Sequence, residues 1–267
     1  MIEQWVIIPV SMLFGFVSMT FGIGVAAMFI PFLVLVYNLP FGAAIAATLL
    51  IEMSGFSAAM ISFVKRKLVS YQLGLQMIMY TVPAAVVGVV ISTKIPIMFL
   101  MIIFSCILII IAILIFHPEH EILYRVDDPS HGIITREFGL AHDTTMVSGT
   151  VSGFLAGMTG TGMGEVNNYV FLKKYRMNGL NATATSMFVI AITAFVAAIS
   201  HIVHIIIDHP EYLAANSLLV VYAISGVLVG IFIAHKLEPS MKSRTRERFV
   251  ATLFFVLGIV TILSVII

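Results

Sequence analysis

The chain has 267 residues, of which 60% are hydrophobic and 10% are charged, and its formal net charge at pH 7 is +1. Soluble domains average about 45–50% apolar and roughly 25% charged residues, so this composition excludes a water-soluble globular protein. Neither the net charge nor a basic aromatic patch indicates nucleic-acid binding. We therefore expect an all-α polytopic membrane protein whose surroundings are the lipid bilayer.

In chain order, six apolar stretches are each long enough to cross the hydrocarbon core as one helix, which takes roughly 20 residues. They are 41–64, 71–93, 95–116, 180–207, 214–235 and 249–267. Two other stretches, 5–37 and 143–172, are too long for one crossing and are interrupted by glycines, "FGIG" in the first and "TGTGMG" in the second. We expect each of these two to form a broken helical hairpin.

The chain divides into two halves of similar layout around a polar stretch. We predict a first transmembrane repeat at 1–116, a polar cytoplasmic linker at 117–142 and a second transmembrane repeat at 143–267. An offset of 138 residues places Gly22, Gly24, Ala44, Ala46 and Thr48 on Gly160, Gly162, Ala182, Ala184 and Ser186, and an offset of 142 places Gly88 and Lys94 on Gly230 and Lys236. An internal duplication is the better interpretation of these identities.

Basic residues in short loops predict the orientation, because such loops stay in the cytoplasm. The basic clusters are "KRK" at 65–67, "KKYR" at 173–176 and the stretch 236–248. All three share one side only if each broken stretch enters and leaves the membrane on the same side. Both termini then lie outside the cytoplasmic membrane, and the halves form two inverted-topology repeats, as in many secondary transporters.

The glycine stretches predict a binding site near the middle of the membrane. Irregular backbone at this depth is tolerated only where protein or a water-filled cavity covers it, and open helix N-termini favour anions. The predicted substrate-binding residues are Gly22, Gly24, Thr159, Gly160, Thr161, Gly162, Asn167 and Asn168. The alternative is that glycines such as Gly15, Gly153 and Gly157 only allow helices to approach closely.

The paired motifs "FGIGVAAMFIP" with "AAIAATLL", and "MTGTGMGEVNNYVF" with "NATATSMF", resemble the sulfite exporter TauE/SafE family of membrane transporters over nearly the whole chain. The resemblance implies export of sulfur-containing anions such as sulfite and organosulfonates. The family's small hydroxyl positions match Thr48, Thr185 and Ser186, which we add to the substrate-binding residues. The chain lacks the usual glycine triplet in "GIGVAA", and Glu165 stands where the family often has a small or apolar residue.

Two acidic residues in or near apolar stretches are candidates for proton coupling. Glu52 lies near the middle of 41–64, where a charged acid costs around 2.5–3.5 kcal/mol on insertion scales, so a functional role is the default hypothesis. The structural alternative is a protonated acid bonded to a neighbouring helix. Glu165 follows the second glycine stretch and would repel an anion unless it is protonated, or it could bind a cation.

The leading interpretation is a secondary transporter for a small anion, with no cofactor. A cation carrier or channel built around Glu52 and Glu165 is the alternative, and an intramembrane enzyme lacks an evident nucleophile and base. No phosphate-binding loop of the Walker type occurs. His201 and His204 have a spacing that can hold a metal, but we favour an interfacial cap and expect no metal site. A monomer and a homodimer both remain open, as do the transport direction and the coupling ion.

Overall fold

The computed structural model describes residues 4–21, 24–116, 142–175, 177–208, 210–237 and 243–266. Within these ranges the chain is helical and contains no strand, which confirms the all-α prediction. The predicted linker lies outside the described residues except for His142, where a helix begins. The division into two repeats and a linker therefore stays a prediction.

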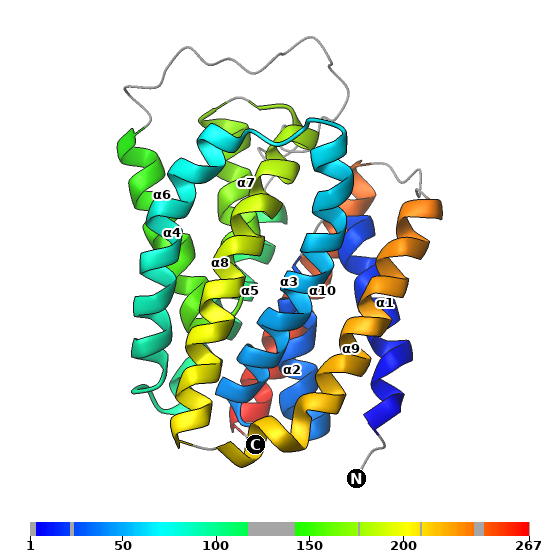
Figure 1. Cartoon of the computed structure of the whole chain (residues 1–267), viewed down its shortest axis with the longest axis vertical. Helices are drawn as coiled ribbons and strands as arrows, with labels where there is room; N and C mark the ends of the chain where they lie inside the picture. Colours follow the sequence, from blue (N-terminus) through cyan, green and yellow to red (C-terminus); the bar gives the residue numbers. More distant parts are fainter. Residues whose placement is uncertain are drawn as a thin grey trace.

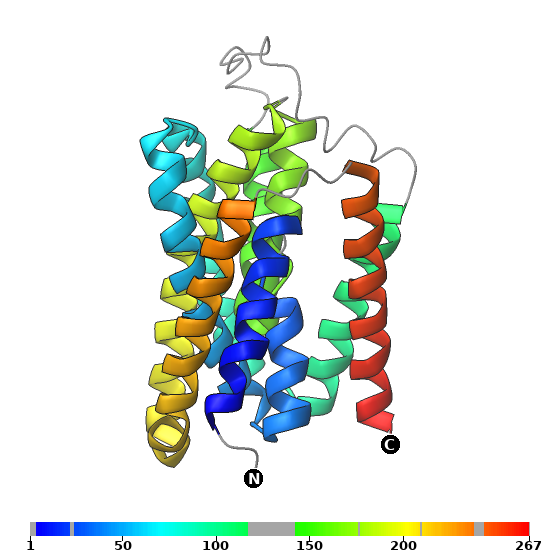
Figure 2. The same ribbon diagram turned by 90° about the vertical axis from the view of Figure 1, so that its right-hand side faces the viewer.

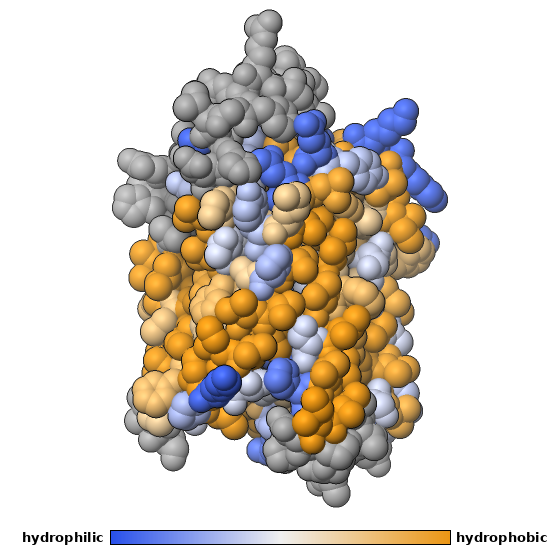
Figure 3. Space-filling view, turned by 60° about the vertical axis from the view of Figure 1, so that its left-hand side comes forward, coloured by the Kyte–Doolittle hydropathy of each residue, from blue (hydrophilic) through white to orange (hydrophobic). Residues whose placement is uncertain are grey.

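Each of the six long apolar stretches forms one helix. They are α3 (Phe41–Lys65), α4 (Tyr71–Ser92), α5 (Ile97–Phe116), α8 (Gly179–Asp208), α9 (Pro210–Leu237) and α10 (Ser243–Ile266). Four of them, α3, α4, α8 and α9, are long and apolar enough to cross a membrane, and α5 and α10 contain shorter apolar segments. An apolar surface covers the middle of the face in Figure 3, and hydrophilic side chains gather toward its ends. The chain is a multi-pass membrane protein.

Both broken stretches form pairs of shorter helices, as predicted. The first, after a short 3-10 helix at Gln4–Val6, comprises α1 (Ile7–Phe21) and α2 (Ala26–Tyr37), and the second comprises α6 (His142–Thr159) and α7 (Met163–Lys173). In Figures 1 and 2, α1 rises from the lower end and α2 returns to it, whereas α6 descends from the upper end and α7 returns there. The two hairpins therefore enter the molecule from opposite ends.

The ends of the helices separate the charged residues in the same way. The upper end in Figure 1, which we call the basic end, carries Lys65 at the end of α3, Lys173 at the end of α7, Lys236 near the end of α9 and Arg248 near the start of α10. Both termini of the chain lie toward the opposite end. This arrangement agrees with the hairpin topology, while the assignment of the basic end to the cytoplasm stays a prediction.

Helix packing relates the halves to each other. The most extensive contacts join α1 with α9, α4 with α6, α5 with α10 and α3 with α8. If α1 to α5 are matched in order with α6 to α10, the first two pairs exchange and the last two map onto themselves. Such a pairing is expected for two halves related by a twofold axis in the membrane plane. The common origin of the two halves remains a prediction.

Glycines on α1, α4, α6 and α9 let these helices touch backbone to backbone. A Cβ atom added to Gly15 would lie 2.5 Å from the carbonyl oxygen of Val227, and one added to Gly157 would overlap the carbonyl oxygen of Ala85. Gly153 faces the backbone of Thr81 in the same way. Close packing therefore explains Gly15, Gly153 and Gly157, as in many membrane helix pairs.

Candidate functional site

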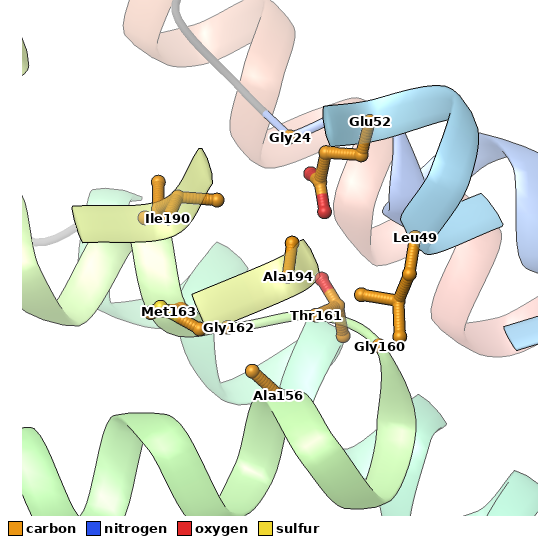
Figure 4. A pocket seen from close by; sticks show the side chains of 11 residues that line it. Gly24, Leu49, Glu52, Ala156, Gly160, Thr161, Gly162, Met163, Ile190 and Ala194 are labelled. Atoms are coloured by element: carbon orange, nitrogen blue, oxygen red, sulfur yellow. The ribbon is translucent and has the colours of Figure 1, made fainter. Parts of the chain in front are cut away.

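A buried pocket lies where the tips of the two hairpins meet (Figure 4). The lining atoms leave about 320 Å³ of empty space, which is at the lower end of the range for small-molecule sites. The lining residues come from both hairpins and from the two central helices α3 and α8; they are Gly24, Leu49, Glu52, Ala156, Gly160, Thr161, Gly162, Met163, Gly164, Ile190 and Ala194. The predicted meeting of the two glycine stretches is therefore observed.

Two half-helices begin at this pocket. Gly162 immediately precedes α7, and Gly24 lies two residues before α2. The first backbone N–H groups of a helix have no acceptor within the helix, and the helix dipole adds positive charge at that end. Both helices thus direct positive N-terminal ends at one enclosed space, which favours an anion.

The turn at the second tip depends on glycine. Gly160 and Gly162 have φ angles of +75° and +91°, which side-chain-bearing L-residues rarely adopt. The N–H of Gly160 donates to the carbonyl oxygen of Ala156 at 2.7 Å, and this bond ends α6. The chain then reverses and α7 starts at Met163, with the N–H of Val166 donating to the carbonyl oxygen of Gly162 at 3.4 Å.

Glu52 brings an acid to the other side of the pocket. It lies in the middle of α3 and only 6% of its surface is exposed. A Cβ atom added to Gly24 would lie 2.5 Å from Oε1 of Glu52, so the carboxyl group rests directly against the tip of the first hairpin. In Figure 4 the carboxyl group points into the space between the tips, and the Thr161 hydroxyl group faces the same space. The predicted placement of an acid at the site is thus observed.

The pocket is asymmetric with respect to the two halves. The offset of 138 residues places Glu52 on Ile190, and both line the pocket from equivalent positions of α3 and α8. It also places Gly24 on Gly162. One wall is therefore acidic and the equivalent wall is aliphatic, so a ligand on the pseudo-twofold axis would meet two different surfaces.

The predicted hydroxyl groups divide between the pocket and the surrounding structure. Only Thr161 lines the pocket. The hydroxyl group of Thr159 donates to the carbonyl oxygen of Leu155 at 2.8 Å within α6. Thr48 is fully buried one turn before Glu52, and its Oγ1 has no hydrogen-bond partner among the described residues. Thr48 is thus available to a small polar ligand, whereas Thr159 is used locally.

The hydroxyl groups of α8 support neighbouring helix starts. Oγ1 of Thr185 accepts a hydrogen bond of 3.0 Å from the N–H of Ser70, just before α4 begins. The hydroxyl group of Ser186 donates to the carbonyl oxygen of Gly164 at 3.3 Å, in the first turn of α7. The structure places both residues beside the site rather than in the pocket lining, and their contact with substrate stays a prediction.

The two asparagines of α7 lie away from the pocket lining. Asn167 is fully buried and accepts a hydrogen bond of 3.1 Å at Oδ1 from the Ser152 hydroxyl group of α6. Asn168 is partly buried, and its Oδ1 has no partner among the described residues. Gly22 lies outside the described residues, and so does the side chain of Glu165, whose backbone belongs to α7.

One supporting contact was not anticipated from the sequence. Nε2 of His201, on α8, donates to the carbonyl oxygen of Gly157 at 2.9 Å, and 3% of the His201 surface is exposed. This carbonyl group belongs to the last turn of α6, where the helix supplies no further donor. His201 is therefore a buried partner of the hairpin rather than an interfacial cap. Among the residues that the structure describes, no group of side chains is arranged to hold a metal.

Several residues of the lining also escaped the sequence analysis. Leu49, Ala156, Met163, Ile190 and Ala194 are small or apolar and carry no chemical signal of their own. The internal offset held the one usable signal, because it pairs Ile190 with Glu52.

Two hairpins with meeting tips, an enclosed polar pocket and helices long enough to cross a membrane define a polytopic membrane protein with a midplane ligand site. The sequence model of the sulfite exporter TauE/SafE family matches residues 7–261. The chain belongs to this family and is a membrane transporter. A comparison with curated proteins and one with solved structures each found no significant match.

Proposed function

We propose that the protein is a secondary transporter that moves a small anion, sulfite or an organosulfonate, across the cytoplasmic membrane. The observation that supports this most is the pocket at which the N-terminal ends of α2 and α7 meet. Among the described residues no cationic side chain lines this pocket. An anion would therefore be held by backbone N–H groups, by the helix dipoles and by the hydroxyl group of Thr161.

We further propose that Glu52 couples transport to protons. An ionised carboxyl group against the tip of the first hairpin would repel an incoming anion and would compete with it for the N-terminal end of α2. Protonation removes both effects, so the anion and the proton would occupy the pocket together. The opposite wall, Ile190, has no group that could replace Glu52 in this role.

The alternative function is a cation carrier or channel that uses Glu52 and Glu165. It is favoured by one observation, namely that an acidic side chain lines a pocket without a cationic one. Two half-helix N-termini at the same place oppose it, because their positive ends would repel a cation.

The proposed surroundings of the transporter follow from the same topology. We propose that the basic end lies in the cytoplasm and that both termini lie outside. The partners would be the small anion and the bilayer, with no nucleic acid, and the protein would act as a monomer or a homodimer.

The test is transport by purified protein in liposomes with an imposed pH gradient. Sulfite, an organosulfonate, a carboxylate and a divalent metal cation are offered in parallel to the wild type and to Glu52→Gln. We expect sulfite or organosulfonate movement that depends on the gradient in the wild type, and movement without this dependence in Glu52→Gln. Transport of the metal cation alone, abolished in Glu52→Gln, would support the alternative.

A further inference from the structure

The interfaces inside the two hairpins differ at equivalent positions. The offset of 138 residues places Phe14 of α1 on Ser152 of α6, and Phe29 of α2 on Asn167 of α7. We call Phe14 with Phe29 the aromatic seam, and Ser152 with Asn167 the polar seam. In both hairpins these two side chains lie on the two helices that pass each other, so the comparison is between matching sites.

The aromatic seam is tightly closed. The rings of Phe14 and Phe29 meet edge to face, with centroids 5.1 Å apart, and Phe29 is fully buried. Phe32 extends the contact, because its ring centroid lies 5.6 Å from that of Phe14. Packed aromatic rings offer no hydrogen bond to water, and apolar constrictions of this kind exclude water from membrane pores.

The polar seam has an incompletely satisfied amide. Ser152 and Asn167 are both fully buried, and the Ser152 hydroxyl group lies 3.1 Å from Oδ1 of Asn167. Nδ2 of Asn167 has no hydrogen-bond partner among the described residues. Rotating the amide by half a turn lets Nδ2 donate to Ser152, which then donates to the carbonyl oxygen of Gly149, 3.3 Å away, but Oδ1 is left without a partner. In either orientation, one buried polar atom lacks a protein partner.

The two seams lie on opposite sides of the pocket. The helix α7 starts at the pocket with Met163 and runs to the basic end, so Asn167 lies between the pocket and that end. The helix α2 runs from the pocket to the opposite end, so Phe29 lies between the pocket and that end. A ligand that leaves the pocket thus meets a polar surface toward the basic end and an aromatic one toward the other.

We propose that the polar seam is part of the route by which water and the transported anion pass between the pocket and the basic end. The unpartnered amide atom of Asn167 takes a water molecule, and its N–H groups then offer hydrogen bonds to the oxygens of the passing anion. The aromatic seam keeps the matching position at the opposite end dry. This inference rests on the proposed transport function and adds to it the side on which the second hairpin opens.

Cysteine accessibility tests the water route without using transport. In a Cys106→Ser background, single Ser152→Cys and Phe14→Cys variants are placed in liposomes, so that both ends face water, and are treated with a small charged methanethiosulfonate reagent. We expect Ser152→Cys to react at least tenfold faster than Phe14→Cys. The comparison is stringent because Phe14→Cys opens space for the reagent, whereas Ser152→Cys nearly preserves side-chain volume. Equal rates, or an unreactive Ser152→Cys, would overturn the inference.

A second measurement separates this inference from the proposed function. Sulfite uptake is compared for wild type, Asn167→Leu and Phe29→Leu, each checked for a monodisperse elution profile. We expect at least a tenfold loss of uptake in Asn167→Leu and a smaller loss in Phe29→Leu. Equal losses would count against the polar seam. A wild type that moves no sulfite would refute the proposed substrate, while the cysteine rates would still decide whether water reaches the seam.

Discussion

Replacing Gly162 by alanine separates backbone strain from crowding, because this position has a φ angle of +91° but open space around it. A Cβ atom there would lie 3.5 Å from Cγ2 of Ile107, an ordinary contact. The cost is therefore the left-handed backbone alone, about 1–2 kcal/mol for a residue with a Cβ atom. For a chain of this size, about 2–4 °C per kcal/mol converts this cost into a fall in apparent Tm of about 2–8 °C.

Two matched variants complete this test. At Gly24, the equivalent position in the first half, a Cβ atom would lie 2.5 Å from Oε1 of Glu52. That atom ends a flexible side chain, so it can turn away, and the apparent Tm should fall less than in Gly162→Ala. Gly42, in the first turn of α3, has nothing within 4 Å of an added Cβ atom, so Gly42→Ala should be neutral or stabilising by up to about 1 kcal/mol.

Thermal unfolding of the three purified variants in one detergent gives the comparison. The expected order of stability is Gly42→Ala, then Gly24→Ala, then Gly162→Ala. If Gly162→Ala melts at the same temperature as Gly42→Ala, the argument from the φ angle at the second tip is refuted.

Three further predictions use the same protein. Gly157→Ala should lower the apparent Tm more than Gly24→Ala, because the added Cβ atom would overlap the backbone of Ala85 and force two helices apart. His201→Leu should cost about 1–3 kcal/mol by leaving the Gly157 carbonyl group without its donor, whereas His201→Gln, which keeps an N–H, should recover part of the loss in the same melting assay. Single cysteines at 66 and 174, with Cys106 replaced, should react from the same side of the membrane in intact cells; reaction from opposite sides would contradict the hairpin topology.

The helices and their two interruptions could be read from the sequence. A crossing helix must be apolar over roughly 20 residues, so stretches such as 71–93 and 180–207 are visible by composition alone. The glycines at 160 and 162 mark the break because no other residue tolerates their backbone angles without strain. Glu52 stood out because a buried acid in an apolar stretch is costly.

The partners of each side chain were decided by the tertiary structure. Thr185 and Ser186 are neighbours with the same chemistry, yet one supports the start of α4 and the other the first turn of α7. Asn167 matched the pattern of a ligand residue, but the rotation of α7 turns it toward Ser152 of α6. Helix rotation and the path of the neighbouring helix set these contacts, and neither quantity is encoded locally.

The sequence by itself determined that this protein is a helical membrane protein with two glycine-broken segments, since hydrophobic length and glycine conformation are local properties. Only the tertiary structure decided that both breaks meet at one pocket, that Glu52 faces it from α3, and that Ile190 occupies the equivalent place on α8. These facts depend on how distant helices pack. Packing is governed by the shape of whole helix surfaces, such as the close approach of Gly157 to Ala85, rather than by any short motif.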